Sequence, residues 1–86
     1  MTEIAKDPAP TEIDVRQLVP AQRHAKIFQL VEALTPGASF VLVNDHDPKP
    51  LHYQLEAEHP REFLWVYLQS GPTVWRVEIG KPLRAA

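Results

Sequence analysis

Two short segments of the chain gather the side chains best suited to binding or catalysis. The first contains Arg23 and His24, and the second reads Asn44-Asp45-His46-Asp47. Guanidinium, imidazole, amide and carboxylate groups bind anions, transfer protons or hold divalent metal ions, depending on their arrangement. What these groups can do therefore depends on the elements that position the two segments.

One interpretation of these residues is a metal site. Imidazoles and carboxylates that lie close together suit a borderline or hard divalent ion. The candidate ligands are His24, His46, His52, Asp45 and Asp47. No HxxxH, HxH or HExxH spacing occurs, however, and the ligands would come from three separate segments. The cofactor is therefore unknown, with a divalent metal ion as the candidate.

The other interpretation is structural, and we favour it. Asp47 precedes Pro48 at the start of an expected helix and fits the position of an N-cap. Asn44 and Asp45 suit a turn. His24 shares a helical stripe with apolar residues, as a hydrogen-bonded histidine at the margin of a core would.

Patterns typical of a catalytic site are missing. The chain has no cysteine, which excludes disulfides, thiolate metal sites and a cysteine nucleophile. Ser39 and Ser70 lack a nucleophile elbow, and the three glycines form no phosphate-binding loop. We expect no catalytic residues. An enzyme that pairs His24 with Asp45 or Asp47 for acid/base chemistry is the least favoured alternative.

Hydrophobic periodicity predicts six elements in the order β-α-β-α-β-β. Ile13, Val15 and Leu18 indicate a first strand, and Thr35-Pro36-Gly37 ends the helix that follows it. The remaining elements are a helix over residues 21–34, a buried strand over 39–43, a short helix over 48–58, and strands over 63–68 and 73–79.

This order predicts an α/β chain folded as an α+β two-layer sandwich. A four-stranded mixed sheet carries both helices on one face, with its first two strands parallel and its last two antiparallel. The other face lacks a helical cover, and we expect aromatic side chains of the last two strands to stand partly exposed there. The candidate partner surface consists of Trp65, Tyr67, Trp75 and Arg76.

Both polar segments fall at one edge of this sheet. Arg23 and His24 lie in the first turn of the first helix, and residues 44–47 open the second helix. Ligands of parallel β-α units bind beyond the carboxyl ends of the strands, and helix N-termini present free N–H groups there. The edge formed by Arg23, His24 and residues 44–47 is therefore the candidate ligand-binding edge.

Composition limits the classes of protein. The 86 residues carry a net charge of −2, and their basic residues form no run, which disfavours a nucleic-acid partner. One domain over residues 12–80 is expected, between a disordered lead-in (1–11) and a flexible tail (81–86). No apolar stretch is long enough to span a membrane and no signal peptide is visible, so we expect a cytoplasmic protein without a membrane partner.

Three segments carry a resemblance to a known family. They read IDVRQLVPAQRH, VNDHDP and GPTVWRV, and lie between residues 12 and 79. They closely resemble the bacterial domain of unknown function 2249. That family is similar in turn to the TusA/SirA sulfur carriers, in which a reactive cysteine lies where this chain has Pro20. The resemblance therefore implies a carrier-like fold without sulfur transfer.

The resemblance also implies partners. Relatives occur alone or joined to hemerythrin-like and cupin-like domains, often near genes for denitrification or nitric-oxide chemistry. The implied role is a non-enzymatic binding or interaction domain, accessory to metal- or redox-linked proteins. The family supplies no catalytic residues that could be transferred to this chain.

Overall fold

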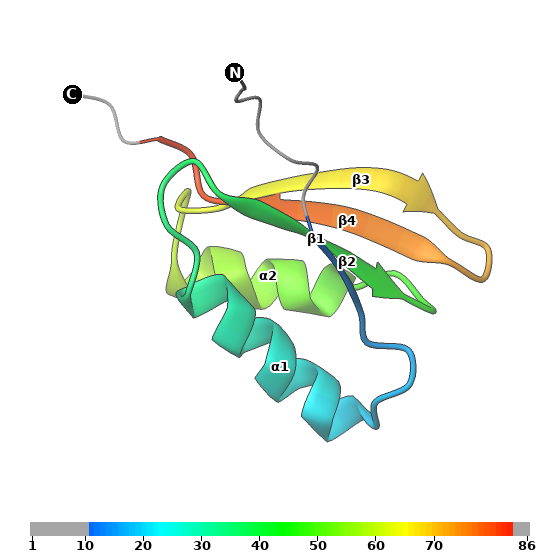
Figure 1. Cartoon of the computed structure of the whole chain (residues 1–86). Coiled ribbons are helices and arrows are strands. Elements are labelled where there is room, and N and C mark those ends of the chain that lie inside the picture. The colour runs from blue at the N-terminus through cyan, green and yellow to red at the C-terminus, as the bar shows by residue number, and fades with distance from the viewer. Residues whose placement is uncertain (1–10, 84–86) are drawn as a thin grey trace, which may run out of the picture.

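A computed structural model describes residues 11–83, which form two helices and one four-stranded sheet (Figure 1). The elements are β1 (Thr11–Asp14), α1 (Pro20–Glu32), β2 (Ser39–Asn44), α2 (Lys49–Glu58), β3 (Leu64–Ser70) and β4 (Trp75–Gly80). The predicted order is confirmed. Residues 1–10 of the expected lead-in (1–11) and residues 84–86 of the expected tail lie outside the described residues, whereas Thr11, the last residue of that lead-in, begins β1.

The sheet has the strand order β1-β2-β4-β3. β1 and β2 are parallel, while β4 is antiparallel to both β2 and β3. The predicted pairings are thus confirmed, and a further one appears because β4 inserts between β2 and β3. β2 and β4 are consequently the central strands, and the apolar run of β2 is buried on both faces.

Both helices cover the same face of the sheet, which makes the fold a two-layer α+β sandwich (Figure 1). The core lies between the layers. Ile27 and Val31 of α1 and Leu51 and Leu55 of α2 are buried against the sheet. The sheet contributes Phe40, Leu42, Val77 and Ile79. The three- and four-residue spacing of the helical residues places them on one face, as the sequence predicts.

The first strand is shorter than predicted and ends at Asp14. The Asp14 carboxylate accepts a hydrogen bond from the backbone N–H of Arg16 at 3.0 Å, which turns the chain. Val15 is still buried, and its N–H bonds to the carbonyl oxygen of Val43, but Leu18 belongs to the turn. A side chain that competes for the backbone thus ends β1 where the apolar pattern continues.

The prediction that the aromatic residues of the last two strands face the uncovered side is wrong. Trp65 lies opposite Ile79 and Tyr67 opposite Val77, and both aliphatic side chains are fully buried beneath the helices. Because opposite residues in antiparallel strands share a face, Trp65 and Tyr67 also lie on the helix side. Trp65 packs against the core and stacks on His52 of α2, while Tyr67 lies edge-on to Trp65 and remains 38% exposed.

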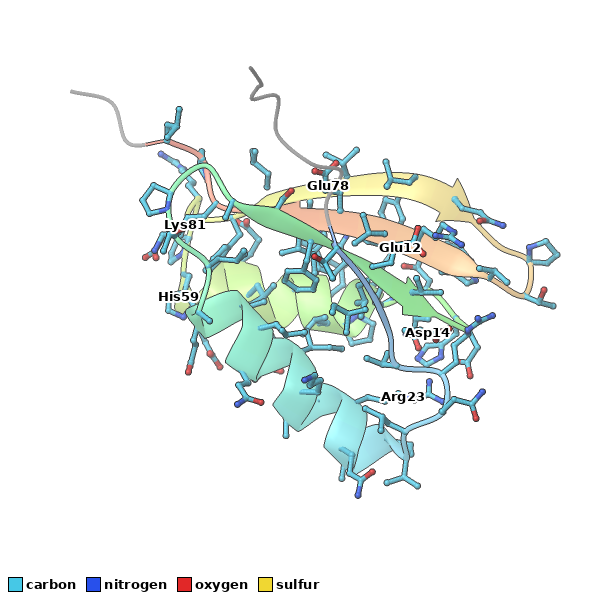
Figure 2. All side chains as sticks on the ribbon, in the orientation of Figure 1. Glu12, Asp14, Arg23, His59, Glu78 and Lys81 are labelled. Carbon is cyan, nitrogen blue, oxygen red and sulfur yellow. The ribbon has the colours of Figure 1, made fainter. Side chains whose placement is uncertain are left out.

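The sheet face away from the helices, called the open face below, carries a mixture of charged and aliphatic side chains. Glu12, Val41, Glu78 and Val66 follow one another across the four strands. Figure 2 labels the two glutamates of this row. The Ser39 hydroxyl donates to Glu78 at 2.8 Å. Arg76 pairs with Glu12 and donates to Gln69, so it is the one member of the predicted partner surface placed here by its register.

The chain remains paired beyond β4. The N–H of Lys81 bonds to the carbonyl of Ala38, and the carbonyl of Lys81 accepts from the N–H of Gly37. Gly37 has a φ of +89°, a conformation that favours glycine in the turn after α1. The backbone is thus held to Lys81, one residue into the segment expected to be a flexible tail. Within residues 11–83, no helix is long and apolar enough to cross a membrane.

Candidate functional site

Arg23 joins the two polar segments that the sequence places at one edge (Figure 2). Its guanidinium bonds bidentately to Asp45, at 2.9 and 3.1 Å. It also donates to the side-chain oxygen of Asn44, at 2.9 Å, and to the backbone carbonyls of Leu18 and Arg16. The planar fork of arginine suits such a set of acceptors. Arg23 therefore fixes the β1–α1 loop against the end of β2.

Asp45 is held between a guanidinium and an imidazole. The Arg23 side chain, and after it His46, hold the pKa of the Asp45 carboxyl well below its ordinary value. The Nδ1 atom of His46 lies 2.7 Å from an Asp45 oxygen, while the His46 side chain remains 67% exposed. Asp45 thus orients His46 in the way that a carboxylate orients a metal-binding or proton-transferring histidine.

A hollow of about 180 Å³ opens between the starts of α1 and α2. We call it the helix-start hollow. Four predicted residues of the ligand-binding edge line it, namely Arg23, His24, Asn44 and His46. His24 is exposed and stacks on Phe28, with ring centroids 4.6 Å apart. Two of the three candidate imidazoles, those of His24 and His46, therefore line one depression.

The other residues of the predicted metal site are engaged elsewhere. Asp47 accepts a hydrogen bond from the Tyr67 hydroxyl at 2.7 Å. His52 stacks on Trp65, with centroids 4.5 Å apart and planes within 3°. Among residues 11–83, no three His, Asp or Glu side chains are placed to hold one metal ion together. The five candidate ligands thus do not form one cluster.

Asp47 does not have the predicted role of an N-cap. α2 begins at Lys49 with Pro48 in the cap position, and no side chain caps it. Asp47 bonds to Tyr67 across the sheet instead. Burial, and then this hydrogen bond, raise the pKa of Tyr67. A tertiary contact thus takes the carboxylate that the sequence assigns to the helix.

Sequence reasoning missed the apolar part of the helix-start hollow. Pro20, Pro48 and Pro50 line it together with Ile27 and Leu51. From the sequence alone, the prolines indicate where helices start, and the aliphatic residues are assigned to the core. Because all three prolines lie at helix starts, and the helices begin at the same edge, the sequence does contain the signal that they converge.

The ion pair of Asp45 predicts a loss of stability in acid. Its folded-state pKa lies below the ordinary value of 3.8, so the unfolded chain binds the proton first as the pH falls. The stabilisation is therefore complete above about pH 5 and is lost progressively below about pH 4. Urea unfolding over this range should show a weaker acid dependence in Asp45→Asn than in the parent chain.

Glu56→Gln is the control for this experiment. Glu56 is exposed and makes no ion pair or side-chain hydrogen bond within the described part of the chain. Its acid dependence should match that of the parent. Equal slopes in Asp45→Asn and Glu56→Gln would show that the Arg23–Asp45 pair does not couple folding to pH.

Comparison with known proteins identifies the family but no structural relative. No curated protein and no solved structure matches the chain. A family model described as an uncharacterized conserved protein, domain of unknown function 2249, matches residues 12–81. This match spans β1 to β4 and includes both polar segments at the helix-start edge. The chain therefore belongs to the domain of unknown function 2249 family.

Proposed function

We propose that the chain is a non-enzymatic interaction module that binds another protein through the helix-start hollow. The observation that carries this proposal is the fixation of the hollow by Arg23, whose five hydrogen bonds join its two loops. A site that is already formed in the free protein loses less conformational entropy on binding. The hollow is therefore prepared to receive a partner side chain.

The chemistry of the hollow favours a partner segment that combines an acidic and an apolar residue. Neither helix has an acidic residue in its first turn or a side chain that caps it. The partial positive charge at each helix N-terminus is therefore not offset by a carboxylate in its own first turn. Arg23 neutralises Asp45, the imidazoles of His24 and His46 supply polar groups at the rim, and prolines and aliphatic side chains supply an apolar surface.

The biological setting forms part of the proposal. We propose a cytoplasmic accessory role beside metal- or redox-linked proteins, with hemerythrin-like or cupin-like proteins as candidate partners. The scaffold resembles TusA-type carriers, but no sulfur transfer is proposed because none of the 86 residues is a cysteine. Pro20, which replaces the carrier's cysteine in the aligned register, lines the same hollow.

Affinity capture from bacteria grown with little oxygen tests this function. The parent chain should retain a specific protein that is lost with the double variant His24→Ala/His46→Ala. His59→Ala is the matched control, because His59 lies outside the hollow at the end of α2. Reconstitution with the purified partner should reproduce both results. Retention of the partner by the double variant would place the contact elsewhere and overturn the proposal.

A divalent metal site is the second candidate function. The observation in its favour is that Asp45 orients His46, and that His46 and His24 line the same hollow. Two imidazoles leave coordination positions for water or for a group of a partner protein. In this case the module would hold a metal ion jointly with its partner.

Titration with zinc, copper, nickel and iron, followed through the histidine ring signals by NMR, distinguishes the two candidates. A metal site at the hollow would shift or broaden the signals of His24 and His46 and leave those of His52 and His59 unchanged. The effect on His24 should disappear in His46→Ala. If all histidine signals stay in place with excess metal, the metal function is wrong and the protein-binding function is unaffected.

A further inference from the structure

β3 forms an edge of the sheet and has one neighbour, β4. Within residues 11–83, no backbone hydrogen bond outside the sheet reaches residues 64–70. Half of the N–H and C=O groups of an edge strand point away from its neighbour and can pair with another strand. The outer side of β3 is therefore a template for strand addition.

The two edge strands of the sheet differ in the features that prevent pairing with another chain. β1, at the other edge, has four residues and carries the charges of Glu12 and Asp14. β3 has seven residues, reads LWVYLQS, and contains neither a charged residue nor a proline. Short length, charge and proline are the features that prevent edge strands from pairing with other chains. β1 has two of these features and β3 has none.

The exposed apolar surface is concentrated on the same strand. Leu64, Val66 and Leu68 are 54%, 49% and 53% exposed. Of the seven large hydrophobic residues exposed in the described part of the chain, four belong to β3. Val66 lies beside Glu78, on the open face of the sheet. Exposed apolar side chains that coincide with an unpaired edge are typical of an interaction surface.

We propose that β3 pairs antiparallel with β3 of a second copy of this chain, in a register centred on Val66. Two-fold symmetry places one residue opposite its own copy. With Val66 at that position, Leu64 lies opposite the partner's Leu68, and Trp65 lies opposite the partner's Tyr67. Each exposed aliphatic residue of the strand then meets another one, and each aromatic residue meets an aromatic residue.

A second copy fits this edge because two β3 strands placed side by side bring no like charges together. Like charges placed directly opposite each other destabilise a strand pair, and β3 contributes no charge to any pair. The register of β3 against β4 is regular from Leu64 to Tyr67 and shifts at Leu68, the extra residue of a bulge, so the regular pairing available to a second copy is short. The resulting interface is small, below the roughly 1,200 Å² of a standard stable complex. We therefore expect a dimer that dissociates on dilution.

Sedimentation over a dilution series tests the dimer with matched variants. The parent chain should change from dimer to monomer on dilution, and Val66→Lys should remain a monomer throughout. Val19→Lys introduces the same charge at a valine that is 57% exposed, far from β3 in the sequence, and should behave like the parent. Circular dichroism checks that both variants are folded. A parent chain that is monomeric at every concentration would overturn the proposal.

Single cysteines test the register, since the chain has none of its own. Opposite Cα atoms of an antiparallel pair are about 4.5–5.5 Å apart, within the range of a disulfide. Val66→Cys should therefore form a disulfide-linked dimer with a mild oxidant such as diamide. Glu78→Cys lies on β4, so the two copies would be three strand spacings apart, about 14 Å, and should not link.

The reverse pattern identifies a different dimer. Linking of Glu78→Cys without Val66→Cys would indicate two open faces packed together, and would overturn strand pairing. Dimerisation that persists in Val66→Lys would also overturn it. The dimer surface and the helix-start hollow share no residue, so either proposal can fail without the other.

Discussion

Replacement of Arg23 by alanine is expected to lower the melting temperature by several degrees and to abolish capture of the partner. The Arg23 side chain is only 16% exposed, and its guanidinium donates to the side-chain oxygen of Asn44, itself a residue with 4% exposure. Removal of a network donor leaves buried acceptors without partners, which costs more than the lost bond alone. Thermal unfolding and affinity capture measure the two effects.

Arg23→Lys and His24→Ala show whether the planar, forked shape of the Arg23 guanidinium is the cause of the expected stabilisation. Lysine keeps the charge, but it cannot bond bidentately to Asp45 while it also reaches Asn44. Arg23→Lys should therefore lose most of the stability lost in Arg23→Ala. His24→Ala removes an exposed neighbour in the same turn and should leave the melting temperature nearly unchanged. Full stability in Arg23→Lys would contradict the role of the fork.

Replacement of Leu42 by alanine should destabilise the fold by about 2–5 kcal/mol, the usual range for a buried leucine. Leu42 is completely buried at the centre of β2, on the helix-covered face. Since a domain of this size has a total stability of only about 5–10 kcal/mol, the variant should be near the limit of folding. Urea denaturation measures the loss.

Leu64→Ala is the matched control for Leu42→Ala. It removes the same atoms from another strand, where the side chain is 54% exposed on the open face. In dilute solution, where the chain is monomeric, its effect should stay within about 0.5 kcal/mol. Similar losses for both leucines would mean that the open face is covered and that the assignment of the two faces is wrong.

Local patterns explain why the six elements could be predicted. The stripe of Ile27 and Val31 requires a helix with one apolar face, and the uninterrupted run of β2 requires a central strand. The element boundaries were less predictable. β1 ends early because the Asp14 side chain accepts a hydrogen bond from the backbone N–H of Arg16. The apolar pattern does not indicate whether the chain turns here or continues as a strand.

The candidate site was predictable in its position but not in its contacts. The sequence places Arg23, His24 and the segment of residues 44–47 at one edge, because consecutive β-α units begin their helices there. Which carboxylate pairs with Arg23 depends on side-chain directions in folded space. Asp45 meets the guanidinium, while Asp47, two residues later, reaches Tyr67 on β3.

The sequence by itself determined that cysteine chemistry is absent and which residues lie at the edge where both helices begin. Absence of cysteine and the spacing of the helical stripes are properties of the chain, independent of packing. Tertiary structure decided the strand order and, with it, the two surfaces. Insertion of β4 between β2 and β3 is a pairing between distant segments, which local patterns do not specify. That pairing turns Trp65 and Tyr67 toward the helices and leaves β3 at the edge of the sheet, with β4 as its one neighbour.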